Sequence, residues 1–237
     1  MTFDHKPEQV LEQLVEICRQ AGEAILKWYD GDMGVTHKAD DSPLTKADLA
    51  SHELILAQLS KYWGDIPVLS EESAAIPYDT RQGWRQYWLV DPLDGTKEFI
   101  NRNGEFTVNI ALIRDHRPVM GVVHVPVTDV SYFGAASCGA WRQQGVDAET
   151  AISVRRPAAT PPVIVGSRSH ANPELAEQLD KLGPHKLTSM GSSLKVCRLA
   201  EGLADFDPRT GPPCEWDTAA AQAVVEAAGG QVVTIDG

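Results

Sequence analysis

Residues 88–96 read WLVDPLDGT, an apolar run that ends in two carboxylates three positions apart. A short apolar run of this kind is typical of a buried strand. Asp91 and Asp94, on a turn that Gly95 frees, can face one another across a hard cation. Neighbouring carboxylates repel each other and are costly to desolvate, and a divalent ion offsets both effects. Taken alone, the spacing is more typical of a solvated acidic turn, so a metal site needs support from elsewhere in the chain.

Two other parts of the chain repeat this layout of apolar residues followed by acids. Glu71 and Glu72 follow the apolar run at 66–69, and Asp217 stands at the start of a predicted helix. Three acidic ends that are distant in sequence and adjacent to buried elements are hard to explain by solvation alone. They favour one shared metal site.

A competing chemistry exists for the motif at 91–96. Phosphatases of the haloacid dehalogenase type use Asp-x-Asp-Gly-Thr, in which the first Asp is a covalent nucleophile. In this chain Pro92 occupies the position two before Asp94, so no nucleophile stands there. Attack by a metal-activated water is therefore the better mechanism for this sequence.

The composition is that of an ordinary globular protein. Hydrophobic residues make up 43% and charged residues 23% of the 237 positions, with a formal net charge of -12. This charge argues against a nucleic-acid polymer as partner, because such proteins usually carry a basic stripe. The four cysteines lack C-x-x-C spacing, the N-terminus lacks a signal-peptide core, and no run approaches the ~20 apolar residues of a membrane span. We expect a cytoplasmic protein without an integral membrane segment, compatible with peripheral attachment to the inner membrane.

The periodicity of apolar residues predicts two lobes. A helix is expected over 7–28, and a second begins near Thr45, where Asp48 completes a capping-box variant. Strands are predicted at 66–69 and 87–90, followed by an antiparallel meander at 106–112, 119–125 and 130–135. Beyond the prolines at 161 and 162, strands are predicted at 163–165, 186–190, 205–206 and 232–235, and helices at 173–182, 193–200 and 217–228. We expect an α+β lobe at residues 1–157 and an α/β lobe at 158–237.

Together the acidic motifs resemble the signatures of the inositol monophosphatase superfamily. The resemblance rests on residues 91–96, on Glu71 with Glu72, and on residues 216–220 running into 226–230. Residues 87–113, 166–170 and 191–195 further resemble the bacterial 3′(2′),5′-bisphosphate nucleotidases of that superfamily. Family members usually continue beyond the strand predicted at 232–235. We therefore expect either missing closing strands or a lobe that is completed differently.

The resemblance implies a layered αβαβα sandwich of the inositol monophosphatase and fructose-1,6-bisphosphatase type, with the metals between the lobes. It implies one Mg²⁺ held by Glu71, Asp91 and the Leu93 carbonyl, and a second held by Asp91, Asp94 and Asp217. Oxygen ligands of this kind independently suit a hard octahedral ion. Two or three Mg²⁺ ions per site are implied, with inhibition by Li⁺ and Ca²⁺.

Asp48 and Thr96 match the family's pair of residues that orient and deprotonate the attacking water. In this pair the carboxylate accepts a hydrogen bond from the Thr hydroxyl, whose oxygen accepts one from the water. Considered without the resemblance, Asp48 is explained by helix capping alone.

Further polar residues are interpreted as substrate ligands. Backbone N–H groups of Gly95 and Thr96 can meet phosphate oxygens. Ser192, Ser193 and Lys195 offer a second phosphate or ribose site, although their spacing also fits a helix cap with a surface lysine. By resemblance, the residues expected to contact substrate are Glu71, Leu93, Asp94, Gly95, Thr96, Ser167, His170, Ser192, Ser193, Lys195, Arg209 and Asp217.

These residues lead to the hypothesis of a Mg²⁺-dependent phosphomonoesterase. It would hydrolyse 3′-phosphoadenosine 5′-phosphate to AMP and phosphate and clear a by-product of sulfate assimilation. Its partner is a small nucleotide bisphosphate, and we expect a monomer or a homodimer. Inositol monophosphate is the alternative substrate, and fructose 1,6-bisphosphate a more distant one. A catalytically silent metal- or nucleotide-binding module is the alternative from another class, and it would require the loss of a ligand or of the pair Asp48 and Thr96.

Overall fold

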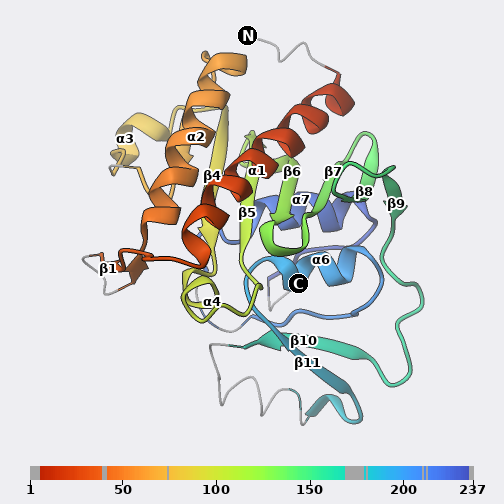
Figure 1. The fold of residues 1–237 in the computed structure, drawn as a ribbon. Coiled ribbons are helices and arrows are strands. Elements are labelled where there is room, and N and C mark those ends of the chain that lie inside the picture. The colour runs from red at the N-terminus through yellow and green to blue at the C-terminus, as the bar shows by residue number, and fades with distance from the viewer. Residues whose placement is uncertain are drawn as a thin grey trace.

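A seven-stranded sheet forms the centre of the fold (Figure 1). The computed structural model describes residues 6–38, 42–73, 75–168, 179, 181–209, 211 and 213–234. In sheet order, the strands are β3 (Val68–Ser70), β4 (Gln86–Asp94), β5 (Thr107–Arg114), β6 (Arg117–Val125), β7 (Val130–Ala135), β8 (Gly139–Gln144) and β9 (Thr150–Ile152). β3 and β4 are parallel, and each later pair of neighbours is antiparallel. The predicted meander is confirmed, and it continues through β8 and β9, which are more polar and were not predicted.

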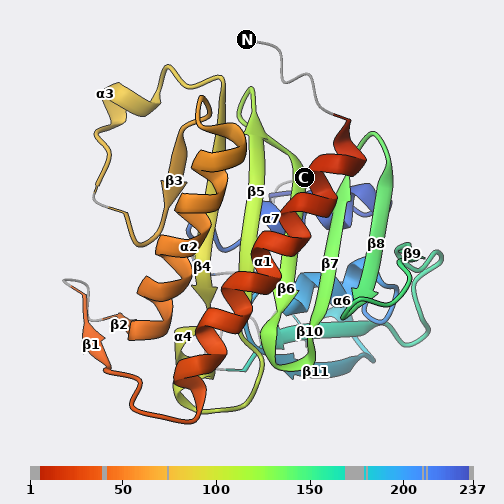
Figure 2. The same cartoon turned by 45° about the horizontal axis from the view of Figure 1, so that its top comes forward.

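Two long helices cover one face of this sheet (Figure 2). α1 (Pro7–Tyr29) packs on β5, β6 and β7, and α2 (Lys46–Trp63) lies beside α1 and packs on β4. The Thr45 side chain accepts from the N–H groups of Ala47 and Asp48, and the Asp48 carboxylate accepts from the Thr45 N–H. The predicted capping box is confirmed. It fixes Asp48, which is buried, at the start of α2.

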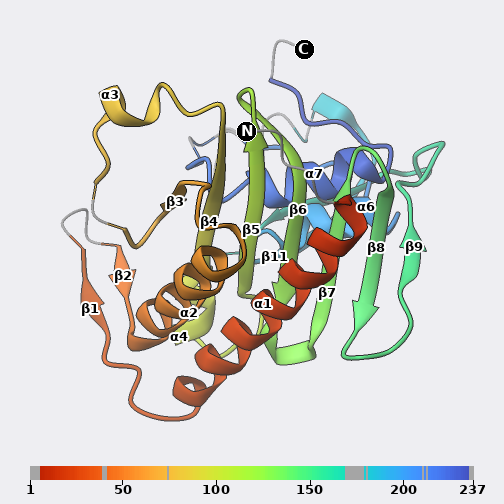
Figure 3. The same ribbon diagram turned by 90° about the horizontal axis from the view of Figure 1, so that it is seen from above.

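A second pair of helices covers the opposite face of the sheet (Figure 3). They are α6 (Leu194–Ala200) and α7 (Ala219–Ala227). α7 approaches β6 so closely that a Cβ on Gly121 would lie 2.8 Å from the Ala220 Cα, so the contact depends on small residues. α7 begins two residues later than predicted, and Asp217 therefore precedes the helix instead of lying in its first turn.

A small parallel sheet of β10 (Val163–Ser167) and β11 (Lys186–Met190) lies against α6. Phe206 joins β10 by a single bridge to Ile164, where a short strand was predicted. The strand predicted at 232–235 is wrong over its described part, because Val232 and Val233 pair with no described strand and stand 46% and 69% exposed. The helix predicted at 173–182 lies almost entirely outside the described residues. The layers that are described follow the expected order of helices, sheet, helices, sheet.

Short elements that were not predicted complete the described chain. They are β1 (Thr36–His37), β2 (Pro43–Leu44), α3 (Tyr78–Arg81), α4 (Thr96–Ile100) and the 3₁₀ turn η1 (Pro126–Thr128). None of the described helices has both the length and the apolar character needed to cross a membrane. The four cysteines, all of them described, form no disulfide.

The core is divided by the central sheet into two clusters. On β4, Trp88 and Val90 face the cluster beneath α1 and α2, whereas Leu89 faces the cluster beneath α6 and α7. Because both faces of β4 are covered, its sequence reads as a continuous apolar run. Asp91, which follows Val90 in β4, is buried in the same way and is only 1% exposed.

Candidate active site

Asp91 and Asp94 lie within β4 and not on a turn beyond it. Asp91 pairs with Asn109 of β5 and Asp94 with Thr107, so three steps along β4 match two along β5. Residues three apart on a regular strand point to opposite faces, and the extra residue of this β-bulge allows both carboxylates to face the same side. The turn predicted from the sequence is therefore corrected to a bulge.

Asp217 completes a cluster of three carboxylates with Asp91 and Asp94. One oxygen atom from each residue lies within 4.8 Å of the other two. Asp217 is held just before α7 by the Cys214 N–H, which donates to Asp217 Oδ2 at 3.0 Å. Such a convergence of carboxylate oxygens is a candidate site for a hard divalent cation.

Asp94 is fixed by donors from the sheet and from the turn before α6. Its Oδ2 accepts from the Ser193 N–H at 2.6 Å and from Asn109 Nδ2 at 3.2 Å. Asn109 also donates to Ser193 Oγ at 2.9 Å, and Ser193 Oγ donates to the Asp217 carbonyl at 2.8 Å. This network joins β4, β5 and the segments before α6 and α7, so it holds Asp94 and Asp217 in their relative positions.

The electrostatics of the cluster favour a bound cation. Burial raises the pKa of Asp91 well above its usual range, and the negative charges of Asp94, Glu71 and Asp217 raise it further. Burial followed by the charge of Asp94 raises the pKa of Asp217 to about 6. A divalent ion would offset both the desolvation and the repulsion, so the residues present fit such an ion.

Glu71 follows β3, beside β4, and lies next to the cluster without being one of its three converging carboxylates. Burial raises the pKa of Glu71, and the neighbouring Lys38 ammonium opposes this shift. Lys38 Nζ lies 2.7 Å from Glu71 Oε1 and 2.6 Å from Glu72 Oε1, and Glu71 is also within hydrogen-bonding reach of Asp91. One ammonium is thus shared by two carboxylates at the edge of the cluster.

Leu93 is buried inside the bulge and connects Asp91 to Thr96. Its N–H donates to Asp91 Oδ1 at 3.1 Å, and its carbonyl oxygen lies 3.4 Å from Thr96 Oγ1. Thr96 follows Gly95, whose φ of 90° is a left-handed value that glycine adopts without strain. The structure therefore brings Leu93, Gly95 and Thr96 to the carboxylate cluster.

Asp48 reaches the same place from the start of α2. Thr96 Oγ1 lies 3.3 Å from Asp48 Oδ1, and Asp48 Oδ2 accepts from the Thr45 N–H at 2.8 Å. Burial raises the pKa of Asp48, and the hydrogen bonds from Thr45 oppose this shift. Ser51 Oγ donates to the Pro92 carbonyl at 2.7 Å, which ties α2 to the bulge.

The residues predicted to contact substrate gather in part around the turn before α6. Lys195 lies inside α6 and is buried, and its Nζ donates to the Ser192 carbonyl at 2.9 Å. Burial lowers the pKa of Lys195, and the positive charge of Arg209 lowers it further. Arg209 Nε donates to Asp207 at 3.0 Å, whereas Arg209 Nη2 is buried and has no hydrogen-bond partner within the described residues. Two cationic side chains therefore lie close together on this side of the cluster.

Ser167 and His170 are the remaining two residues that were predicted to contact substrate. Ser167 is the last residue of β10 and lies next to Met190 in the register of β11. His170 lies outside the described residues. The structure therefore gives Ser167 a position on the small sheet and leaves the interpretation of His170 as a prediction.

The family of the chain follows from comparison with known proteins. A model of the inositol monophosphatase family matches residues 6–237. The chain belongs to the inositol monophosphatase family. The resemblance noted from the sequence is thereby confirmed.

Curated members of this family include close relatives. The 3′(2′),5′-bisphosphate nucleotidase CysQ of Salmonella typhimurium is 54% identical over 226 residues, which cover 94% of this chain and 89% of the relative. CysQ of Escherichia coli is 53% identical over the same shares of the two chains.

Solved structures of the inositol monophosphatase family share the fold. CysQ from Bacteroides thetaiotaomicron, a bacterial member of the family, is 41% identical with a TM-score of 0.81, and the match covers 93% of this chain and 87% of that one. An IMPase from Thermotoga maritima has a TM-score of 0.78 at 22% identity, over 93% of this chain and 84% of that one. The expected layered fold is confirmed.

Several residues at the site of this inositol monophosphatase family member were not found from the sequence. Asn109 could have been found from the sequence, because it is a polar amide within an apolar predicted strand. In the structure it is buried beside the acidic end of β4. Lys38 stands in a polar segment and had no such signal. Glu105 and Arg168 lie within the stretches 87–113 and 166–170 that resemble the nucleotidases, but the sequence did not indicate that they form an ion pair near the turn before α6.

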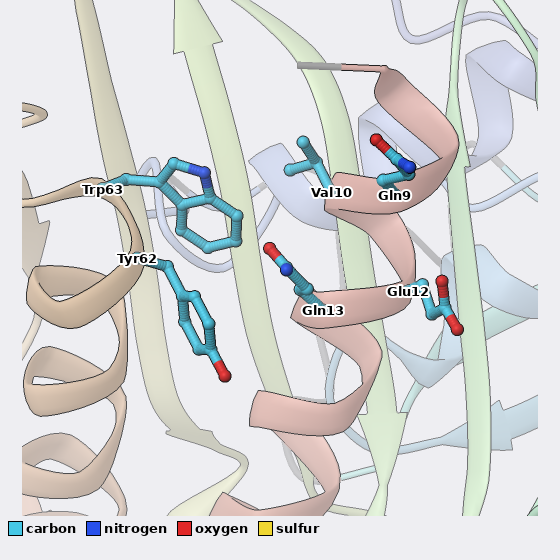
Figure 4. Close-up of a pocket in the computed structure, with 6 residues that line it drawn as sticks. All are labelled: Gln9, Val10, Glu12, Gln13, Tyr62 and Trp63. Atoms are coloured by element: carbon cyan, nitrogen blue, oxygen red, sulfur yellow. The ribbon is translucent and has the colours of Figure 1, made fainter.

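A surface pocket elsewhere on the molecule does not belong to this site (Figure 4). It lies between α1 and α2 and is lined by Gln9, Val10, Glu12, Gln13, Tyr62 and Trp63. Trp63 ends α2, whereas Asp48 lies in its first turn, so roughly 22 Å of helix separates the pocket from the carboxylates. The pocket contains a single carboxylate and no cation, and we assign it no chemistry.

Proposed function

We propose that this chain is a Mg²⁺-dependent phosphomonoesterase that hydrolyses 3′-phosphoadenosine 5′-phosphate to AMP and phosphate. The observation that carries the proposal is the 54% identity, over 94% of the chain, to a relative named as a 3′(2′),5′-bisphosphate nucleotidase. The buried carboxylate cluster supports it, because phosphate-ester hydrolysis commonly uses divalent ions on such ligands. The proposed role is the removal of a nucleotide by-product of sulfate assimilation in the cytoplasm.

The metal ligands in this proposal are oxygens of five residues. Glu71, Asp91 and the Leu93 carbonyl would hold one Mg²⁺, and Asp91, Asp94 and Asp217 a second. Mg²⁺ bound there supplies charge neutralisation for the phosphate and lowers the pKa of water. We extend the proposal to inhibition by Li⁺ and Ca²⁺, as the family resemblance implies. The residues at 1–157 would supply most ligands, and those at 158–237 the last ligand and most contacts to the nucleotide.

The proposed proton path runs through Thr96 and Asp48. The Thr96 hydroxyl can donate to Asp48 Oδ1 while its oxygen accepts from a water, and this orients the water toward phosphorus. Asp48 stays in place because Thr45 holds its other oxygen. In this proposal the backbone N–H groups of Gly95 and Thr96 would donate to the oxygens of the phosphate that is cleaved.

The second phosphate of the substrate distinguishes the proposal from hydrolysis of inositol monophosphate. Lys195 and the unpaired Nη2 of Arg209 offer cationic donors near the cluster, and a 5′-phosphate would satisfy them. Ser192 adds a hydroxyl, and Ser193, Ser167 and His170 are further proposed ligands, although the Ser193 hydroxyl already donates to the Asp217 carbonyl. A substrate with one phosphate would leave this second cationic group unused.

The test is a comparison of catalytic efficiency on two substrates. With Mg²⁺, kcat/KM for 3′-phosphoadenosine 5′-phosphate is expected to exceed that for inositol 1-phosphate. The variant Arg209→Met should lower the efficiency on the nucleotide and leave that on inositol 1-phosphate nearly unchanged. A preference for inositol 1-phosphate in the wild type would overturn the substrate assignment and keep the metal site.

A further inference from the structure

Glu105 makes an unusual set of contacts at the edge of the proposed substrate site. It lies between α4 and β5, and both of its carboxylate oxygens accept from Arg168, at 2.8 Å from Nε and 2.7 Å from Nη2. Glu105 Oε2 also accepts from the Gly191 N–H at 2.8 Å. Arg168 in turn donates to the Ser189 carbonyl at 3.0 Å. One carboxylate therefore binds the residue that follows β11 and the residue that follows β10 at the same time.

The carboxylate of Glu105 is held in its charged form. Burial raises its pKa, but the hydrogen bonds from Arg168 and Gly191 outweigh this and hold the pKa of Glu105 below its usual value. A bidentate pair of this geometry is stronger and more directional than an ordinary exposed ion pair. Glu105 therefore holds Arg168 and the Gly191 backbone in fixed positions, although it lies near the surface.

The turn that Glu105 holds has little freedom. A Cβ on Gly191 would lie 2.5 Å from Glu98 Cγ and 3.1 Å from the Glu105 carbonyl, so the turn is pressed against the segment that carries both glutamates. Ser192 has a φ of 50°, a left-handed value that serine adopts only when its surroundings require it. The conformation of this turn is therefore imposed by its neighbours.

The same turn is held at its other end by Asp94. The Ser193 N–H donates to Asp94 Oδ2 at 2.6 Å, two residues after the Gly191 N–H donates to Glu105. Two carboxylates from the first half of the chain thus fix both ends of the turn that presents Ser192 and leads into Lys195. Asp94 has a proposed role at the metal, whereas Glu105 is not one of the three carboxylates that converge there among the described residues.

We propose that Glu105 is a positioning residue that sets the affinity for the nucleotide substrate. It does so by fixing the 191–193 turn and Arg168, and it takes no part in metal binding or in the chemical step. The proposal rests on the proposed function, since it assumes that this turn contacts the substrate. Loss of the anchor would let the turn relax, and a small displacement of binding groups weakens ligand contacts strongly.

Asp205 provides a matched control. It accepts a bidentate pair from Arg155, at 3.1 Å from Nε and 2.6 Å from Nη2, and it also accepts from the N–H groups of Ala159 and Val163. These contacts hold the segment that leads into β10 and touch no residue assigned to the site. Asp205→Asn therefore removes an equally firm anchor, with an expected loss of stability and no effect on substrate affinity.

The experiment compares Glu105→Gln with Asp205→Asn in the full-length protein. For Glu105→Gln, KM for 3′-phosphoadenosine 5′-phosphate and the Kd for AMP should both rise about tenfold, while kcat stays within about twofold. The Kd for Mg²⁺, measured by calorimetry without substrate, should stay unchanged. Arg168→Lys keeps the charge and loses the bidentate geometry, so it should give a smaller increase in KM in the same direction.

Three results would overturn the proposal. They are an unchanged KM in Glu105→Gln, an equal rise of KM in Asp205→Asn, and a weakened Mg²⁺ affinity in Glu105→Gln. Failure of the proposed function looks different, because the wild type would then neither hydrolyse the nucleotide nor bind AMP. The wild-type assays therefore separate the two cases, and the Mg²⁺ titration shows independently whether the carboxylate cluster is intact.

Discussion

The hydroxyl of Thr96 lies 3.3 Å from Asp48 Oδ1, while Thr45 occupies Asp48 Oδ2. One buried carboxylate therefore caps α2 and reaches the site. Asp48 has two separate roles, capping α2 and taking part in the proposed catalysis. A substitution at Thr96 affects only the second role, because Thr96 contacts Asp48 Oδ1 and the cap uses Oδ2. Thr96→Val should lower kcat about a hundredfold, because the hydroxyl that relays the proton is lost while the capping box stays intact.

Thr96→Ser is the control, since it keeps the hydroxyl and should stay within a few-fold of the wild type. The measurement is kcat of the wild type, Thr96→Val and Thr96→Ser by steady-state kinetics at saturating Mg²⁺. If Thr96→Val retained nearly full kcat, the proton path through Asp48 would be wrong.

Mg²⁺ binding should depend on pH through Asp217. Its pKa in the metal-free protein is raised to about 6 from the ordinary 3.8, and the metal requires the ionised form. Affinity for Mg²⁺ should therefore fall as the pH falls through about 6. The same shift stabilises the protonated fold, so the contribution of Asp217 to stability declines as the pH rises from 3.8 to about 6.

Calorimetric titration of the wild type and of Asp217→Asn at several pH values checks this prediction. The variant should bind Mg²⁺ weakly at every pH. Wild-type affinity that stays constant across the interval around pH 6 would contradict the assignment of Asp217 as a ligand.

Removal of Lys38 should strengthen metal binding. Its ammonium lies 2.7 Å from Glu71 Oε1 and competes there with a cation. Lys38→Met should lower the Kd for Mg²⁺ several-fold and should destabilise the metal-free protein, because Glu71 and Glu72 are left to repel each other. Thermal unfolding with and without Mg²⁺ measures both effects.

Lys46→Met serves as the control, since Lys46 pairs with exposed Asp32 and touches no carboxylate of the cluster. It should leave the Kd for Mg²⁺ unchanged. Weaker binding in Lys38→Met would mean that Lys38 supports the metal instead of competing with it.

His124 should make the fold sensitive to acid. Burial lowers its pKa from 6.5 to about 4, and its Nδ1 lies 3.0 Å from Ser131 Oγ. The unfolded chain binds the proton more tightly, so stability is lost as the pH falls from 6.5 to about 4. The loss amounts to about 3 kcal/mol at most. Urea unfolding of the wild type and of His124→Gln, both with a chelator present, should show their difference in stability shrinking over this interval.

The parts of the site that are formed by residues close together in the sequence could be predicted, because the residue types and their spacing indicate the contacts. The capping box of Thr45 and Asp48 is one example, and the acidic end of β4 is another. The bulge at Asp91 and Asp94 could not be predicted, since it depends on the register with β5. The family resemblance supplied the distant partner Asp217 before any geometry was known.

The contacts that join distant segments were the part that the sequence did not reveal. The pair of Glu105 and Arg168 is separated by 63 positions. Both residues lie in stretches that resemble the nucleotidases, but nothing in the sequence indicated that the two side chains pair. Over its described part, the strand predicted at 232–235 is wrong for a related reason: an apolar β-branched run forms a strand only where a neighbouring strand is available, and none of the described strands pairs with it.

The most direct test of the central claim is product analysis of 3′-phosphoadenosine 5′-phosphate incubated with the protein and Mg²⁺. We predict equimolar 5′-AMP and phosphate, and neither product when a chelator removes the metal. Formation of adenosine 3′-phosphate, or hydrolysis that persists with the chelator, would contradict the proposed orientation of the substrate or the proposed metal chemistry. No hydrolysis with Mg²⁺ present would contradict the proposed activity itself.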